Sequence, residues 1–168
     1  MKVYIGRYPK DHNKEQKVNV QIDKWDTWNM DATLAHIIVP MLKQLKATKH
    51  GAPYVADEDV PVELQKAASP PVKDELGEVD DNYFKRWDWV MDEMIFAFES
   101  KLIDWEDQFW KRPAELDLTT YPEDAGKDLI PLRWKDEGVC DWDGMREYET
   151  RIQNGFLLFG KYYNGLWD

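Results

Sequence analysis

Three carboxylates, Asp88, Asp92 and Glu99, form the first group of residues whose spacing could support chemistry. In a segment with helical periodicity, Asp88 and Asp92 lie one turn apart on one face, and Glu99 follows about two turns later. Carboxylates spaced in this way can hold a divalent cation, as a metal-dependent nucleotide hydrolase requires. An acidic helix face turned toward solvent has the same pattern and is its more common cause. Such a hydrolase needs a second acidic pair on a neighbouring helix, and the last helical segment offers only Glu147 and Glu149.

A second group combines the cations Lys46, Lys49 and His50 with Gly51, at the end of the first helical segment. These cations could bind phosphate, and Gly51 would allow the backbone to approach a ligand closely. The same residues also suit an ordinary helix C-terminus, where cations complement the helix dipole and a glycine in the left-handed conformation caps the last turn.

We expect an anionic ligand beside these cations, with four further residues as candidate contacts. Trp28 or Tyr54 could stack on a nucleobase, because an indole or phenol ring presents a flat apolar face. Trp28 and its neighbour Trp25 could equally serve as core anchors. Arg151 and Lys161 could add positive charge from a neighbouring helix or subunit.

Metal binding through histidine or through a calcium loop has less support in the sequence. His12, His36 and His50 stand in different elements and lack ligand spacing, so we expect no metal site. Residues 141–144 begin like a calcium loop, but the closing glutamate does not follow in register. This segment instead suits a helix N-terminus with Asp143 as its cap.

The charge of the chain limits the kinds of partner that it can bind. The chain has 168 residues, which suit a single domain over 1–168, and a net charge of −11, which disfavours long nucleic acid. The charge is uneven, because residues 1–50 hold 9 Lys and Arg against 5 Asp and Glu, whereas residues 51–168 hold 13 against 28. An anionic ligand should therefore prefer the N-terminal third.

The single Cys140 excludes an intrachain disulfide and suggests a reducing compartment. The sequence shows neither a secretory signal nor an apolar run long enough to span a bilayer. These features lead us to expect a cytoplasmic protein without a membrane partner.

The periodicity predicts an α+β fold that is predominantly helical. An N-terminal β-hairpin should pack on three main helices, with a long, irregular and acidic connection between the first two. The predicted elements are the hairpin over 1–24, with strands near 2–8 and 17–23, and the helices over 29–50, 82–109 and 144–166. Residues 62–68 could form a short helix, and residues 111–141 are the least regular part.

Within the first predicted helix, Asn29 is a candidate N-cap and Pro40 should introduce a kink. Its apolar residues recur at helical spacing and predict a core-facing stripe of Met30, Leu34, Ile37, Ile38, Met41 and Leu45. In the last helix, Gly155 and Gly160 each cost roughly 1 kcal/mol relative to alanine, which indicates that another helix or a ligand approaches the backbone closely.

A lone hairpin is marginally stable, and the chain carries more aromatic surface than one small core needs. We therefore expect a homo-oligomer, either a dimer or a tetramer.

Several long motifs resemble a family of small, Trp-rich proteins of tailed phages. In the first half of the chain they are residues 25–31 (WDTWNMD), 34–35 (LA), 40–46 (PMLKQLK) and 48–51 (TKHG). In the second half they are residues 86–90 (RWDWV), 92–95 (DEMI), 151–155 (RIQNG) and 158–163 (LFGKYY). The resemblance covers most of the chain outside residues 60–80 and 111–140.

Within this group, the chain resembles the viral sponge proteins that sequester the cyclic oligonucleotide signals of bacterial CBASS immunity. The resemblance implies a homotetramer that binds cyclic di- or trinucleotides such as 3′3′-cGAMP without cleaving them. It also implies action in the host bacterial cytoplasm during infection, with no cofactor. It identifies no contact residues, so the ligand-binding residues named above come from physical reasoning.

Two other functions stay open at this stage. One is a phage interaction module that docks on a host or virion protein through exposed tryptophan and acidic surface. The other is the metal-dependent hydrolase that would use Asp88, Asp92 and Glu99.

Overall fold

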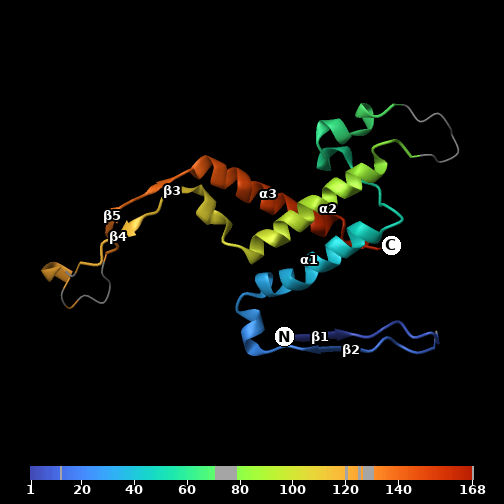
Figure 1. Ribbon diagram of the computed structural model, residues 1–168, viewed down its shortest axis with the longest axis horizontal. Helices are drawn as coiled ribbons and strands as arrows, with labels where there is room; N and C mark the ends of the chain where they lie inside the picture. The colour runs from blue at the N-terminus through green and yellow to red at the C-terminus, as the bar shows by residue number, and fades with distance from the viewer. Residues whose placement is uncertain (12, 71–78, 120, 125, 127–130, 168) are drawn as a thin grey trace.

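Three helices and three short antiparallel strand pairs make up the computed structural model, which describes residues 1–11, 13–70, 79–119, 121–124, 126 and 131–167. Helix α2 (Tyr83–Glu99) lies between α1 (Met30–Thr48) and α3 (Trp142–Lys161) and packs on both (Figure 1). The predicted α+β fold, predominantly helical, is confirmed.

The ends of the helices differ from the predicted bounds. Helix α2 ends at Glu99, ten residues early, because the chain turns through the 3₁₀ helix η5 (Ser100–Leu102) and becomes extended at Ile103. A second 3₁₀ helix, η6 (Trp105–Phe109), completes the predicted range. Helix α3 ends at Lys161 and is followed by the 3₁₀ helix η8 (Tyr163–Gly165).

Helix α3 begins two residues before the predicted start and is capped by Asp141, not by Asp143. The Asp141 carboxylate accepts a hydrogen bond of 3.0 Å from the Gly144 backbone N–H, which satisfies one of the free donors of the first turn. Asp143 instead pairs with Arg146 within the first turn of the helix.

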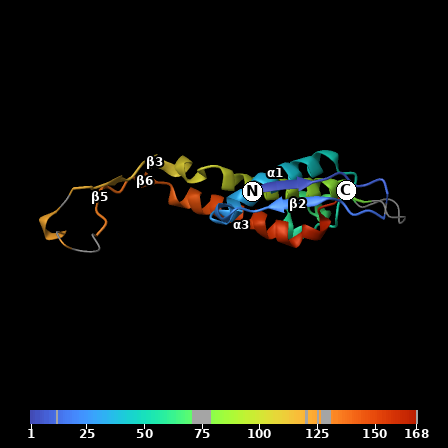
Figure 2. The same cartoon turned by 90° about the horizontal axis from the view of Figure 1, so that it is seen from below.

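The N-terminal hairpin pairs β1 (Lys2–Ile5) with β2 (Val18–Gln21), as predicted. Contrary to the prediction, every residue of both strands stays exposed, and the apolar residues of β2 do not face a core. The hairpin runs beside α1 and is joined to the helices at its base by the 3₁₀ helix η1 (Lys24–Thr27), as Figures 1 and 2 show.

The described residues between 110 and 140 form an arm that projects from the helices (Figure 1). It contains two strand pairs that the sequence did not predict: β3 (Trp110–Arg112) with β6 (Val139–Cys140), and β4 (Glu115–Leu116) with β5 (Trp134–Asp136). Gly138 makes the first pair possible, because its φ is +74° and a Cβ there would lie 2.7 Å from the Arg112 carbonyl oxygen. Strands of two or three residues are too short to give a detectable alternation in sequence.

The described part of the connection between α1 and α2 contains three single-turn 3₁₀ helices, η2 (Asp57–Asp59), η3 (Val62–Leu64) and η4 (Lys66–Ala68). The last two replace the short helix predicted over 62–68. Arg86 of α2 fixes this connection, because its guanidinium is 1% exposed and donates to the Leu64 carbonyl (2.9 Å) and to Asp80 (2.5 Å). The hydrogen bond from Arg86 lowers the pKa of Asp80.

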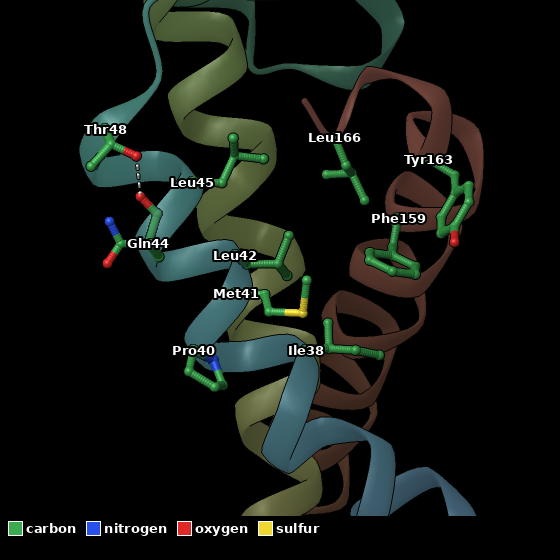
Figure 3. Close-up of a pocket in the computed structure, with 10 residues that line it drawn as sticks. All are labelled: Ile38, Pro40, Met41, Leu42, Gln44, Leu45, Thr48, Phe159, Tyr163 and Leu166. Carbon is green, nitrogen blue, oxygen red and sulfur yellow. Dashed lines mark hydrogen bonds between the residues drawn. The ribbon is translucent and has the colours of Figure 1, made fainter. Parts of the chain in front are cut away.

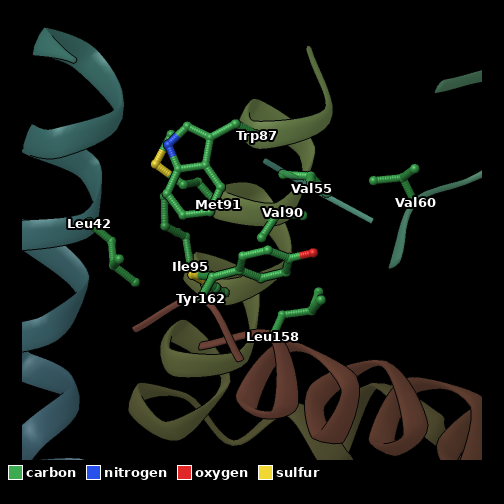
Figure 4. Packing of buried hydrophobic residues seen from close by; sticks show 10 residues of the cluster. Leu42, Val55, Val60, Trp87, Val90, Met91, Ile95, Leu158 and Tyr162 are labelled. Carbon is green, nitrogen blue, oxygen red and sulfur yellow. The ribbon is translucent and has the colours of Figure 1, made fainter. Parts of the chain in front are cut away.

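The core lies along α2, where Trp87, Val90, Met91 and Met94 are fully buried. Leu42 of α1 and side chains from the end of α3 and the connection pack around them (Figure 4). Burial of each large side chain of this kind is worth about 1.5–3 kcal/mol.

Only part of the apolar stripe predicted for α1 meets this core, where Ile38 and Leu45 pack against it and stay partly buried. The residues of α1 that are buried are Ala35, Val39 and Leu42, one helical position away from the predicted set. Met30, Leu34 and Met41 are exposed, because α2 covers only the neighbouring face of α1. The helix runs through Pro40, which is exposed.

Candidate functional site

The carboxylates Asp88, Asp92 and Glu99 of α2 pair with lysines of α1, among them Lys46 and Lys49 of the predicted cation group. The bridges join Lys43 to Glu99, Lys46 to Asp92 and Lys49 to Asp88, each at 2.5 Å. The lysines repeat every three residues along α1, and the carboxylates are four and seven residues apart along α2. Because the two helices run antiparallel, these spacings bring the side chains together as a row of ion pairs. The carboxylates are thus occupied by lysines, and the described residues contain no group of three or more His, Cys, Asp or Glu that could hold a metal.

The side chain of Lys49, a predicted phosphate contact, is largely enclosed. Its side chain is 11% exposed, and its Nζ also donates to the Lys46 carbonyl at 3.3 Å. Lys49 occupies the C-cap position of α1, and its backbone N–H donates to the Leu45 carbonyl at 2.9 Å. An anion would have to displace Asp88 to reach the Lys49 ammonium group.

Gly51 and Tyr54 follow α1, and their contacts with a ligand remain a prediction. Among the described residues, only Gly126 and Gly138 have positive φ, so Gly51 is not a left-handed helix cap. The Tyr54 ring is exposed but has the Lys66 ammonium 4.5 Å above its centroid. His50 precedes Gly51 and is not without an interaction partner.

Arg151 and Lys161, the two cations of α3, also have acidic partners. Arg151 makes a two-pronged contact with the buried Glu93 of α2, at 2.7 and 2.9 Å, and stacks 3.8 Å from the Phe96 ring centroid. Lys161 bridges to Asp59 at 2.6 Å. The hydrogen bonds that Arg151 and Lys161 donate to Glu93 and Asp59 raise the pKa of Arg151 and of Lys161, respectively.

Trp28 lies at the opposite end of α1 from the predicted cation cluster. With a rise of 1.5 Å per residue, the 21 positions that separate Trp28 from Lys49 correspond to about 30 Å. The eight predicted ligand-binding residues are therefore not gathered in one place, and their joint role remains a prediction.

Trp25 and Trp28 form the most exposed aromatic surface near the predicted site residues. They are 65% and 79% exposed, and their ring centroids are 6.4 Å apart with the planes tilted by 46°. Together with Asn29 and Thr33 they line an open hollow of about 360 Å³. The Lys24 ammonium lies 4.7 Å from the Trp25 ring centroid. Two indoles, one cation and two polar side chains suit a flat, anionic ligand.

Hydrogen bonds hold this pair of indoles on the turn η1. The Trp25 backbone N–H donates to Asp23 at 3.1 Å, and the Asp23 backbone N–H donates to Asp26 at 2.6 Å, so each end of the turn caps the other. The N-terminal ammonium of Met1 donates to the same Asp26 at 2.7 Å and lowers its pKa. Asp26 is therefore a positioning residue that joins the hairpin to the indole pair.

A larger apolar groove lies between α1 and the end of α3 (Figure 3). It has a volume of about 840 Å³. Eight apolar and aromatic residues dominate its lining: Ile38, Pro40, Met41, Leu42 and Leu45 from α1, and Phe159, Tyr163 and Leu166 from the C-terminal end. Gln44 and Thr48 lie at one side, and the Thr48 hydroxyl donates to the Gln44 carbonyl at 2.9 Å. The groove is suited to aliphatic side chains and poorly suited to phosphate.

Sequence reasoning named Trp28 but missed Lys24, Asn29 and Thr33 as its neighbours. The spacing of Trp25 and Trp28 was the signal in the sequence for the indole pair, because residues three apart on a helical turn share a face.

No family model, curated protein or solved structure matches the chain. Within the described part of the chain, no helix combines the length and the apolar character needed to cross a bilayer. The function is therefore inferred from the residues of the chain itself.

Proposed function

We propose that this protein is a non-catalytic phage protein that binds and sequesters cyclic oligonucleotide signals in the cytoplasm of an infected bacterium. Its ligands are cyclic di- or trinucleotides such as 3′3′-cGAMP. The observation that carries this proposal is the pair of exposed indoles, Trp25 and Trp28, held on a hydrogen-bonded turn.

Base stacking supplies the main part of the binding energy in this proposal. Stacking of a base on an aromatic side chain is worth about 1–3 kcal/mol and tolerates any base. Asn29 and Thr33 offer polar groups to the base edge, and Lys24 offers a charge to a phosphate. A ring of two or three nucleotides presents several bases, so a homodimer or homotetramer could engage it with one indole pair from each subunit.

The salt bridges between α1 and α2 favour this proposal over the metal-dependent hydrolase. A catalytic cation at Asp88, Asp92 and Glu99 would have to displace the three lysines that pair with them. The same pairing makes Lys46 and Lys49 weaker candidates for phosphate contacts than Lys24.

Calorimetric titration with a panel of cyclic di- and trinucleotides tests the proposal. We expect one ligand to bind and to be recovered intact after the protein is denatured by heat. Trp28→Leu should weaken binding about 5- to 150-fold, which corresponds to the loss of about 1–3 kcal/mol of stacking. Trp142→Leu, which removes another exposed indole far from η1, should leave affinity unchanged.

Two results would contradict the proposal. Recovery of a linearised or hydrolysed nucleotide would show that the protein is an enzyme. Equal affinity for the Trp28→Leu and Trp142→Leu variants would show that the indole pair does not bind the ligand.

A docking function is the second candidate, and a specific observation favours it. The hairpin and the groove between α1 and α3 both expose apolar side chains. No binding by any nucleotide, together with a stable complex with another chain, would favour this function.

A further inference from the structure

The geometry points to the groove between α1 and α3 as the seat of the N-terminal hairpin of a second copy of this chain. Exchange of the two hairpins would give a symmetric dimer with two identical contacts. This inference does not depend on nucleotide binding.

One face of the hairpin is entirely apolar. The register places Val3 opposite Val20 and Ile5 opposite Val18, and opposed residues point to the same face of a sheet. Ile22, two residues after Val20, continues this face. These five side chains are between 42% and 59% exposed. A two-stranded hairpin needs a surface to cover such a face if it is to be stable.

The groove offers a surface of matching character. Met41, at its edge, is 61% exposed, and the neighbouring Ile38 and Leu45 are partly buried, because they line the groove and also pack against the core. Phe159 and Tyr163 form the opposite wall (Figure 3). The same chain therefore contains both an apolar groove and a hairpin face of matching apolar character.

The hairpin of the same chain is held away from this groove. Its base is fixed by the reciprocal hydrogen bonds of Asp23 and Asp26 and by the ion pair between Met1 and Asp26. In this position its apolar side chains remain exposed, although the hairpin runs alongside the helices (Figures 1 and 2). Because these contacts hold the base of the hairpin in this position, we assign the groove to the hairpin of a second copy.

The surface area of the chain leaves room for a large interface. The accessible surface is 13043 Å² for a mass of 20.0 kDa. A compact monomer of that mass exposes roughly 8,700 Å², so the chain exposes roughly 4,300 Å² more. A standard protein interface buries about 800 Å² on each partner. The excess is more than sufficient for a dimer with two hairpin contacts.

Charge also favours a second copy as the occupant. Residues 1–22 contain 5 Lys and Arg against 2 Asp and Glu, whereas residues 23–168 contain 17 against 31. The hairpin is therefore cationic and the rest of the chain strongly anionic, so the hairpin of one copy is attracted to the rest of another copy.

Light scattering on matched variants tests the contact. We expect the wild-type chain to be a dimer or a larger multiple of 20.0 kDa at micromolar concentration. Val20→Lys on the apolar face of the hairpin and Met41→Lys in the groove should each give monomers. Asn19→Lys on the other face of the same strand and Ala47→Lys on α1 outside the groove should keep the wild-type mass. Circular dichroism of all four variants serves as the control, and we expect it to show that their helices are retained.

Cross-linking identifies the two surfaces and the chain that supplies each. In a Cys140→Ser background, a chain with Val20→Cys is mixed with a chain with Met41→Cys and treated with a short thiol cross-linker. We expect a covalent heterodimer of about twice the chain mass, and much less of it when Asn19→Cys replaces Val20→Cys. A wild-type monomer, or equal masses for Val20→Lys and Asn19→Lys, would overturn the inference. Cross-linking of the Val20→Cys/Met41→Cys double variant within a single chain would do the same.

Discussion

Gly155 and Gly160 lie in the same helix, yet replacement by alanine should have opposite effects on stability. At Gly155, a Cβ would lie against the Glu93 carbonyl oxygen of α2 and 2.6 Å from Ala97 Cβ. At Gly160, which is exposed, a Cβ would meet no described atom within 4 Å. Gly155→Ala therefore tests the close packing of α3 on α2, whereas Gly160→Ala tests helix propensity alone.

The magnitudes follow from these distances. Alanine is about 1 kcal/mol more favourable than glycine inside a helix, so Gly160→Ala should stabilise the protein by about that amount. Carbon atoms pack at about 3.5–4.0 Å, so Gly155→Ala must push α2 and α3 apart by about 1 Å. Because one obstacle is backbone, rotation of a side chain cannot relieve the contact. Overpacking of this kind costs about 1–3 kcal/mol or more, and we expect a net loss of about 2 kcal/mol.

Thermal unfolding followed by circular dichroism measures both effects. For a chain of this size, 1 kcal/mol corresponds to a change in Tm of about 2–4 °C. Gly160→Ala should raise the Tm by about 2–4 °C, and Gly155→Ala should lower it by about 4–8 °C. The reasoning is refuted if Gly155→Ala is as stable as Gly160→Ala, because α2 would then not contact α3 at this glycine.

Two further predictions concern buried polar groups. Burial, reinforced by a hydrogen bond to Asp59, raises the pKa of Tyr162 from 10.0 to about 12. The folded state holds the Tyr162 hydroxyl proton more tightly than the unfolded state does. This proton therefore contributes fully to the free energy of unfolding below pH 10, and the contribution falls by about 1.4 kcal/mol per pH unit as pH rises toward 12. Urea unfolding at pH 9 to 11 should show this loss in the wild type, and an equal loss in Tyr162→Phe would contradict it. Arg86→Ala should lower the free energy of unfolding by about 3–5 kcal/mol, because it leaves Asp80 without its cation. Chemical denaturation measures this loss, with a variant at an exposed neighbour, Lys85→Ala, as the control. Equal losses in the two variants would refute this role of Arg86.

The sequence by itself determined the local elements. Apolar and polar residues that alternate over 17–23 predicted the second strand of the hairpin, and spacings of three and four predicted the three helices, because these periods are properties of the backbone. The stop of α2 at Glu99 escaped prediction, since 3₁₀ turns continue nearly the same periodicity. The strand pairs of the arm escaped it because pairs of two or three residues have no period to detect.

Only the tertiary structure decided which residues meet. The period of α1 is satisfied equally by a stripe through Met41 and by the buried stripe through Leu42, and the position of α2 selects the second. The same packing joins Lys49 to Asp88, 39 residues away, and so pairs two groups that looked like separate sites. It also separates Gly155, which α2 approaches closely, from Gly160, whose surroundings are open. Periodicity fixes the spacing of side chains along one helix, but burial, ion pairing and close approach depend on the neighbouring helix, whose placement is a property of the whole chain.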